Sequence, residues 1–250
     1  MTQHPENSSP VITNRPNHRM VDRVAAILEA AARSGSGLTL TELAGHIDAP
    51  LSSTQGLANG LVATGYLIER DRTYHLGPAP FFLTRIAGAS PVDAVSNEHL
   101  QEIHAVTGHT VVLAIVVGDS LYYVDHVAES PRYSYLAENF VKRSLIRASS
   151  GWILLSGMSR RDLWSYLSTL SAEDQPFAEE FLDSLRQVQT DQIVVAPAVS
   201  TTGIEGIATS VTADGEIIGS VAVIGDHEEI LNDADTISSI LLKYRGRWSS

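Results

Sequence analysis

Apolar positions in the first third of the chain recur at helical spacing in two blocks, with a break between them. Thr39 and Glu42 are spaced as a capping box, which predicts that a helix begins there. Pro50 disfavours helical geometry in the residue before it, so this helix is expected to end ahead of the proline. A second helix is predicted from Ser52, with Gln55 three residues on as the partner of this polar cap. The two blocks indicate a helix-turn-helix.

Directly after the second block, the apolar positions change from helical spacing to the two-residue repeat of a strand. Strands are predicted at residues 66–70 and 73–76, on either side of a tight turn at Asp71 and Arg72. An amphipathic stretch at residues 20–33 predicts a further helix ahead of the helix-turn-helix. Helices followed by a hairpin in this order indicate a winged helix-turn-helix.

The rest of the chain mixes strand and helix patterns. Strands are expected at 110–118, 121–128, 193–200, 206–213 and 216–224. The last two are joined by Asp214-Gly215, a hairpin dipeptide. Helices are expected at 97–107 and in three segments that begin near Gly151, Ser159 and Ser171. One final helix is expected to carry Ile230 to Tyr244. Residues 130–147 show no period and are expected to form a loop. Hairpins outnumber parallel crossovers, so the fold class is α+β, an antiparallel sheet flanked by helices.

Several stretches give this order a specific resemblance, among them Leu51-Ser-Ser-Thr, Gly65-Tyr-Leu-Ile-Glu-Arg and Ala148-Ser-Ser-Gly-Trp-Ile-Leu-Leu-Ser. The chain resembles the IclR family of bacterial transcription regulators over nearly its whole length after about Arg19. The resemblance implies a disordered arm at 1–18, a winged helix-turn-helix DNA-binding domain at 19–77, a linker helix at 78–91 and a GAF-like effector-binding domain at 92–250. It also implies a homodimer or homotetramer. The linker helix is expected to pack against another subunit, with packing against its own domain as the alternative.

Charge is divided unevenly along the chain. The net charge of −12 alone disfavours a nucleic-acid partner, but the first 85 residues hold seven basic and seven acidic side chains, so the whole excess of acid lies in the rest. Zero cysteines exclude disulfides, thiolate catalysis and cysteine-bound zinc. No apolar run approaches the roughly 18 residues of a membrane span, and the polar N-terminus lacks the apolar core of a signal peptide. A cytoplasmic protein with no membrane partner is expected.

Residues at the start of the second helix are the candidates for reading DNA, because the first turns of a recognition helix reach base edges in the major groove. They are Ser52, Ser53, Thr54, Gln55 and Asn59. Phosphate contacts are expected from Arg19 and from Arg70 and Arg72 of the wing. The positions that are usually basic in the family align with Leu51 and Gly56, so this helix carries no positive charge. An alternative therefore stays open: a sensor or interaction protein whose winged helix no longer binds DNA.

The resemblance places an effector pocket between the GAF-like sheet and the segment 147–156. The candidate lining residues are Leu113, Tyr123, Arg147, Ser149, Ser150, Trp152, Leu155, Gly206, Ala222 and Ile224. Family members that sense small carboxylates carry polar residues where this chain has Gly206, Ala222 and Ile224. The pocket is therefore predicted to take a small aromatic or hydrophobic metabolite, with Ser149, Ser150 or Arg147 holding its polar group. Plain core packing is the alternative for each aromatic side chain.

Motifs for other chemistry are missing from the sequence. No spacing among the nine histidines matches a metal site. A hydrolase would need a nucleophile with a base, and although Ser149 or Ser150 with His126 is conceivable, no G-x-S-x-G motif supports it. Without a P-loop or G-x-G-x-x-G, no nucleotide cofactor is expected. The sequence predicts no catalytic residue and two kinds of partner beside its own copies, a double-stranded DNA operator and a small-molecule effector.

Overall fold

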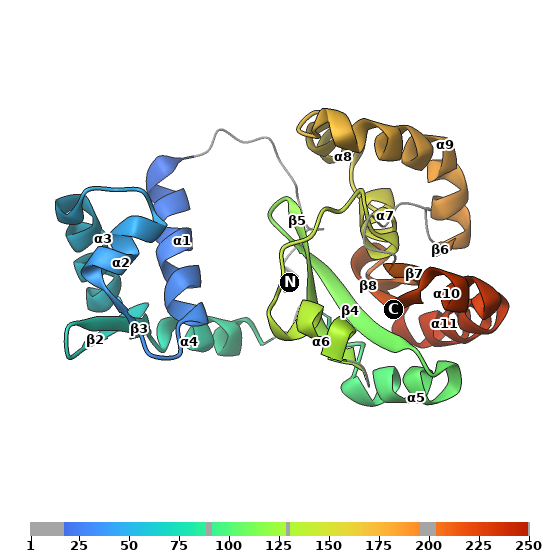
Figure 1. Cartoon of the computed structure of the whole chain (residues 1–250), viewed down its shortest axis with the longest axis horizontal. Coiled ribbons are helices and arrows are strands. Elements are labelled where there is room, and N and C mark those ends of the chain that lie inside the picture. The colour runs from blue at the N-terminus through green and yellow to red at the C-terminus, as the bar shows by residue number, and fades with distance from the viewer. Residues whose placement is uncertain (1–17, 89–91, 129–130, 196–203, 250) are drawn as a thin grey trace, which may run out of the picture. The chain divides into compact units, whose positions relative to one another are not determined.

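A computed structural model describes residues 18–88, 92–128, 131–195 and 204–249 (Figure 1). The chain divides into two compact units, one holding the described residues up to 88 and the other those from 92 onward. Each unit has its own hydrophobic core. The predicted arm at residues 1–18 lies outside the described residues except for His18, as does the end of the predicted linker at 89–91.

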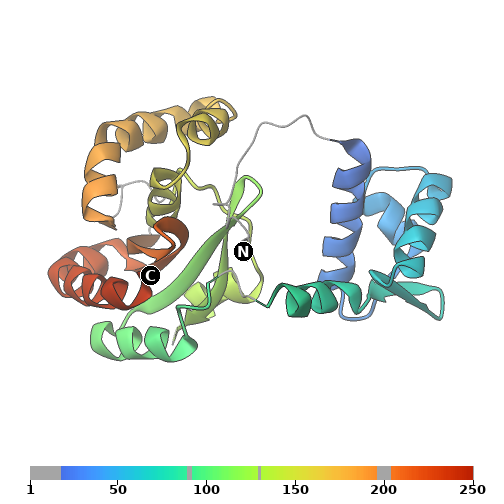
Figure 2. The ribbon, with the colours of Figure 1, turned by 180° about the vertical axis from the view of Figure 1, so that it is seen from behind.

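The N-terminal unit is a bundle of short helices with a small sheet (Figure 2). Its elements are α1 (Arg19–Arg33), β1 (Leu38–Thr39), α2 (Leu40–His46), α3 (Leu51–Ala63), β2 (Leu67–Arg70), β3 (Thr73–Leu76) and α4 (Ala79–Ala87). The strands pair antiparallel in the order β1-β3-β2. Asp71 and Arg72 form the β2–β3 turn with positive φ angles of 49° and 64°. The winged helix-turn-helix predicted from the sequence is confirmed.

The capping box that begins α2 is also confirmed. The Thr39 backbone N–H donates to Glu42 Oε2 at 2.7 Å, and the Glu42 N–H donates to Thr39 Oγ1 at 3.4 Å. The backbone hydrogen bond from Thr39, together with one from its hydroxyl, holds the pKa of the Glu42 carboxyl below its ordinary value. The local sequence therefore fixes where the helix-turn-helix starts.

The start of α3 differs from the sequence prediction. The helix begins at Leu51, with Pro50 as its N-cap, and Ser52 makes no capping hydrogen bond. The Pro50 carbonyl accepts both the Thr54 backbone N–H at 3.0 Å and the Thr54 hydroxyl at 3.1 Å. Proline is compatible with a helix start because the residue there needs no intrahelical N–H donor. The helix therefore starts one residue before Ser52, and its N-cap lies two residues before the predicted one.

The core of the N-terminal unit joins α1, α2, α3 and the hairpin. Its buried members are Ile27, Ala31, Leu43, Ile47, Ala58, Leu61, Leu67 and Tyr74. Helix α4 is different, because none of its residues is buried. Its large apolar side chains, Phe81, Phe82, Leu83 and Ile86, are all exposed within the chain.

The C-terminal unit is built on one five-stranded antiparallel sheet. Its elements are α5 (Asn97–Thr107), β4 (Thr110–Val117), β5 (Ser120–Val127), α6 (Pro131–Glu138), α7 (Ser149–Ser156), α8 (Arg160–Leu167), the 3₁₀ turn η1 (Ala172–Asp174), α9 (Gln175–Asp191), β6 (Ile193–Val195), β7 (Ile204–Ala213), β8 (Glu216–Asp226), α10 (His227–Asn232) and α11 (Ala234–Trp248). The strand order is β5-β4-β8-β7-β6, and the β7–β8 hairpin turns at Asp214-Gly215, as predicted. The predicted α+β class is confirmed.

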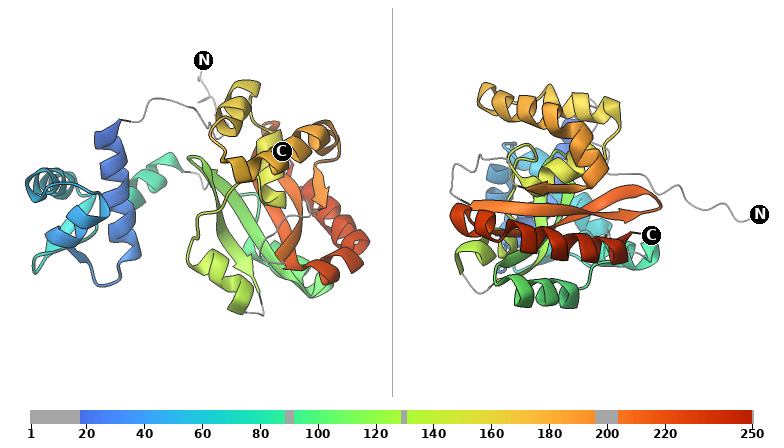
Figure 3. Two further views of the ribbon diagram at one scale, coloured as in Figure 1. Left: turned by 45° about the horizontal axis from the view of Figure 1, so that its top comes forward. Right: turned by 90° about the vertical axis from the view of Figure 1, so that its right-hand side faces the viewer.

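Helices cover both faces of this sheet. Helices α7, α8 and α9 lie on one face, and α5 and α11 lie on the other (Figure 3, right). Each face has its own apolar cluster, one containing Trp152, Ile153 and Phe181, the other Leu100, Ile237 and Trp248. The first face is called the α7 face below. None of the helices in the described ranges is long and apolar enough to cross a membrane.

Two sequence predictions for this unit are wrong. Residues 131–138 form helix α6 instead of a loop, with Tyr133 and Ala137 buried one turn apart against the sheet. The single final helix is two helices that meet at Asp233, whose ψ of 8° leaves the helical range. The Asp233 carboxylate accepts a hydrogen bond from His109 Nε2 at 2.8 Å, so a long-range contact holds the break. The predicted strand 193–200 is observed for Ile193–Val195, and its residues 196–200 lie outside the described residues.

Candidate DNA-reading and effector sites

The outer side of α3 is polar and small. Ser52, Ser53 and Asn59 are exposed, as are Gly56 and Gly60, next to which a Cβ would meet nothing within 4 Å. Thr54, also a candidate from the sequence, is 0% exposed and lies in the core of the unit, with its hydroxyl bonded to the Pro50 carbonyl. Thr54 therefore has no side-chain surface to offer a partner, and we leave it out of the site.

Gln55 is held in place by two neighbours. Its Nε2 donates to Asn59 Oδ1 at 2.9 Å and to the Tyr74 hydroxyl at 3.3 Å. Tyr74 belongs to the core of the unit and is only 3% exposed, so the bond ties an amide on α3 to the wing strand β3. The side-chain amides of Gln55 and Asn59 therefore start from a preset arrangement.

The cationic candidates for DNA contact lie on other elements than α3. Arg70 and Arg72 are exposed at the tip of the hairpin, and Arg19 is exposed at the first residue of α1. The Thr73 hydroxyl donates to the Arg70 carbonyl at 2.7 Å, which fixes the turn between the two wing arginines. Helix α3 contains no Lys, Arg, Asp or Glu. A bound polyanion would therefore meet its cationic contacts at the wing and the start of α1.

In the C-terminal unit, small residues on the sheet let the first turn of α7 approach closely. Gly206, Ala208 and Ala222 lie on β7 and β8, and an added Cβ at Gly206 would be 3.1 Å from Ser149 Oγ and 2.9 Å from Ile224 Cγ2. Three sequence candidates, Gly206, Ser149 and Ile224, are thus brought together. Because Gly206 is in contact range of α7, its missing side chain serves this close packing.

Ser150 is a buried polar residue on this face. It is 1% exposed, and its Oγ has no hydrogen-bond partner within the described ranges. It lies in the first turn of α7, where backbone N–H groups have no intrahelical acceptor. A hydroxyl buried without a partner costs about 1–3 kcal/mol, so a group that accepts or donates a hydrogen bond here would be stabilised.

Two other candidates already have partners in the structure. Arg147 donates from Nε to Asp174 Oδ1 at 2.5 Å, and its guanidinium lies 5.0 Å from the Phe177 ring centre. Although burial opposes ionisation, the hydrogen bonds from Arg147 and Ser171 hold the pKa of Asp174 below its ordinary value. Trp152 donates its indole N–H to the Ile146 carbonyl at 2.8 Å. Its ring meets Phe181 of α9 edge-on, at 5.4 Å between ring centres.

Strand alternation separates the remaining candidates. Tyr123, Leu155 and Ala222 belong to the cluster of the α7 face, but Leu113 belongs to the cluster on the opposite face. Successive residues of a strand point to opposite faces, so Val112 and Ala114 face α7 and Leu113 faces away. Leu113 therefore does not belong with the other candidates. Tyr133 of α6 also belongs to the cluster of the α7 face, and Pro131 in the first helical position is the signal in the sequence that indicates this helix.

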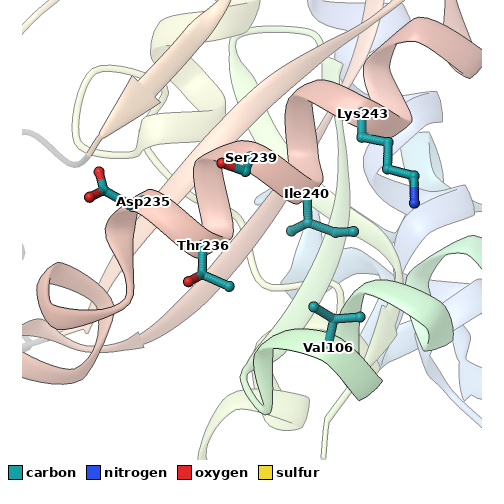
Figure 4. Close-up of a pocket in the computed structure, with 6 residues that line it drawn as sticks. All are labelled: Val106, Asp235, Thr236, Ser239, Ile240 and Lys243. Atoms are coloured by element: carbon teal, nitrogen blue, oxygen red, sulfur yellow. The ribbon is translucent and has the colours of Figure 1, made fainter.

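A surface groove of about 460 Å³ lies on the other side of the unit, between α5 and α11. It is lined by Val106 on α5 and by Asp235, Thr236, Ser239, Ile240 and Lys243 on α11 (Figure 4). In the figure the α11 side chains line up along one edge of the helix, and Val106 points toward Ile240. None of the sequence candidates lines it. Within the described residues, no group of three or more His, Asp or Glu side chains could hold a metal ion.

These two units define a class of protein: a winged helix-turn-helix joined to an α+β unit of the kind that binds effectors. The IclR helix-turn-helix domain matches residues 20–71, and the C-terminal domain described as bacterial transcriptional regulator IclR matches residues 85–244. The chain belongs to the IclR family of transcriptional regulators. Members of this family are transcription factors rather than enzymes.

Solved structures of other family members share the fold. An IclR homologue from Microbacterium hydrocarbonoxydans, complexed with 4-hydroxybenzoate, is 18% identical with a TM-score of 0.71, over 91% of this chain and 96% of that one. An IclR regulator from a Silicibacter species is 20% identical with a TM-score of 0.72, over 91% and 95%. One from Brucella abortus is 15% identical with a TM-score of 0.67, over 94% and 92%. A comparison with curated proteins gives no match.

Proposed function

We propose that this chain is a cytoplasmic, ligand-responsive transcriptional regulator that binds a pseudo-palindromic operator as a dimer or a dimer of dimers. The observation that carries the proposal is the exposed outer side of α3, with Ser52, Ser53 and Asn59 free of the core, beside a wing tipped with two arginines. Such a helix can lie in the major groove while wing cations contact phosphates. Two copies on a two-fold axis would read two half-sites.

The absence of charged side chains on α3 favours a second candidate function for this chain. A helix without cations makes few phosphate contacts, which lowers affinity for any duplex. Under this alternative the chain senses a ligand and contacts proteins through its winged helix. Selection of bound duplexes from a random library, followed by affinity measurement at several salt concentrations, separates the two. The regulator enriches a sequence with two-fold symmetry, and the sensor enriches none.

Replacing both wing arginines tests the proposed phosphate contacts. We expect R70A/R72A to lower the slope of log affinity against log salt by about 3.6 for a dimer on its two-fold operator, because each protomer loses two phosphate contacts and each contact contributes about 0.9. The matched control is R160A/R161A, which replaces two exposed arginines at the start of α8, removes the same charge from the other unit and should leave the slope unchanged. Fluorescence anisotropy with the selected duplex measures both. Equal slopes for the two variants would contradict a role for the wing.

The effector is proposed to bind at the α7 face, with an aromatic or hydrophobic body and one polar group. Support comes from the partnerless Ser150 hydroxyl in the first turn of α7 and from the apolar cluster around it. The relative complexed with 4-hydroxybenzoate makes benzoate and 4-hydroxybenzoate suitable probes. Since Arg147 already pairs with Asp174, we assign the polar group to Ser149 and Ser150 rather than to Arg147.

Removing the Ser150 hydroxyl should weaken binding of these probes about tenfold, the loss expected for one buried hydrogen bond to a charged group. The control is S156A at the other end of α7, because Ser156 is also buried but its hydroxyl is bonded to the Ile153 carbonyl. Isothermal titration with benzoate and 4-hydroxybenzoate measures both variants. Wild-type affinity in S150A, or an equal loss in S156A, would remove Ser150 from the site.

Effector and operator must be coupled for regulation. A ligand alters operator affinity only if it binds the conformation that fits the operator and the conformation that does not with different affinities. This coupling is reciprocal. The operator should therefore change the affinity for the effector by the same factor as the effector changes the affinity for the operator.

A further inference from the structure

Three side chains form a row along α3 that points to a particular kind of base pair. Leu51, Gln55 and Asn59 follow one another at intervals of four residues, so they lie on one side of the helix. Leu51 is the first helical residue, and its large apolar side chain is 52% exposed. Beside it, Ser52 and Ser53 are also exposed. The row therefore begins with an apolar group at the end of the helix that enters the major groove in winged helices.

The amide pair in this row has a defined hydrogen-bonding capacity left over. Both N–H groups of Gln55 Nε2 are engaged, one by Asn59 Oδ1 at 2.9 Å and one by the Tyr74 hydroxyl at 3.3 Å. What remains free for a ligand is the Gln55 carbonyl oxygen, an acceptor, and the Asn59 amide nitrogen, a donor. Adenine presents the complementary pair in the major groove, a donor at N6 and an acceptor at N7.

The same row is poorly equipped to read a G·C pair through guanine. Guanine presents two acceptors, N7 and O6, and its usual partners are Arg or Lys. Helix α3 has neither. Thymine differs from the other bases by its C5-methyl group, which is read by apolar contact. An exposed leucine at the start of the helix is suited to that contact.

We propose that Leu51 reads the C5-methyl group of a thymine and that Gln55 and Asn59 together read an adenine, so that each operator half-site has A·T pairs under α3. This assignment rests on the proposed function, and it names the sequence class that the reading head selects. In this scheme Leu51 and the amide pair determine specificity, while the wing arginines supply affinity that does not depend on sequence.

The test uses the full chain and the duplex that it selects from a random library. Each thymine of the selected operator is replaced in turn by deoxyuridine, which removes only the C5-methyl group. In each half-site we expect one thymine whose replacement weakens binding about fourfold. This loss corresponds to one buried methyl group. The L51A variant should bind the thymine and deoxyuridine operators equally. Because Leu51 is half exposed, this variant is expected to fold, and circular dichroism checks it.

A matched control is L76A, which truncates another partly exposed leucine of the same unit, on wing strand β3. It should keep the preference for thymine over deoxyuridine. The Q55A variant should lose the preference for adenine over guanine at the neighbouring position. A selected operator with G·C pairs at these positions, or an L51A protein that still discriminates thymine from deoxyuridine, overturns the assignment and leaves the regulator intact. Enrichment of no sequence at all overturns the proposed function and the assignment with it.

Discussion

Alanine in place of Gly151 is expected to destabilise the C-terminal unit by about 3 kcal/mol, the upper part of the usual range for overpacking a core. An added Cβ at residue 151 would lie 1.9 Å from the Leu145 carbonyl oxygen and 2.5 Å from its carbonyl carbon. These are backbone atoms of a residue that is 0% exposed, so no side chain can rotate aside. Every residue of α7 is buried, and the helix itself has no free direction in which to move.

Differential scanning calorimetry of the full chain measures this effect. A loss of about 3 kcal/mol in a unit of this size lowers the melting temperature by roughly 6–12 °C. The matched control is G246A in α11 of the same unit, where an added Cβ meets nothing within 4 Å. Alanine is the better helix former by up to about 1 kcal/mol, so G246A should melt at or above the wild-type temperature. A G151A transition within 2 °C or so of wild type would contradict the close packing of α7 on the segment before it.

Serine in place of both Phe82 and Ile86 is expected to dissociate the proposed dimer. The two residues are 62% and 65% exposed and lie four positions apart, on one side of α4. A nine-residue helix with no buried side chain is too short to be stable in water by itself. A second copy of the chain is the proposed cover for this apolar side, in keeping with the dimer that an operator of two-fold symmetry requires.

Each of these side chains contributes about 1.5–3 kcal/mol when fully buried, and a two-fold axis counts each of them twice. The dissociation constant of the dimer should therefore rise at least about 10³-fold. Sedimentation equilibrium over a range of concentrations measures it. The R85S variant changes an exposed residue of the same helix and leaves the apolar side intact, so it should assemble as wild type does. A monomeric wild-type protein, or an F82S/I86S protein that assembles normally, would show that α4 does not join two copies.

Local signals were sufficient to predict the winged helix-turn-helix. The Thr39–Glu42 capping box and the Asp71-Arg72 turn are set by neighbouring residues, and both appear in the structure as predicted. The failures have longer-range causes. Helix α6 is short and buries only a few apolar side chains, so its period was too weak to detect. The break at Asp233 depends on a hydrogen bond to His109, 124 residues earlier in the chain, which no local pattern contains.

The candidate effector residues show a similar division. Ser149 and Gly206 lie far apart in the sequence, and the resemblance to the family places both at the predicted pocket; the structure brings the two residues together. Leu113 was misplaced because its side of the sheet depends on strand alternation and pairing, and the register of β4 with β5 shifts between Leu113 and Ala114. The pairing of Arg147 with Asp174 joins residues 27 apart and could not be foreseen from the sequence.

The separation of cations from α3 has a consequence for how this protein would behave in a changing cell. Ionic strength would act on the proposed phosphate contacts of the arginines at the hairpin tip and at the start of α1, while salt would hardly screen the proposed base contacts of the uncharged row on α3. A rise in salt concentration would shorten the residence time on every duplex by a similar factor. The ranking of one promoter above another would persist, so the same set of genes would stay under control with only the occupancy changed.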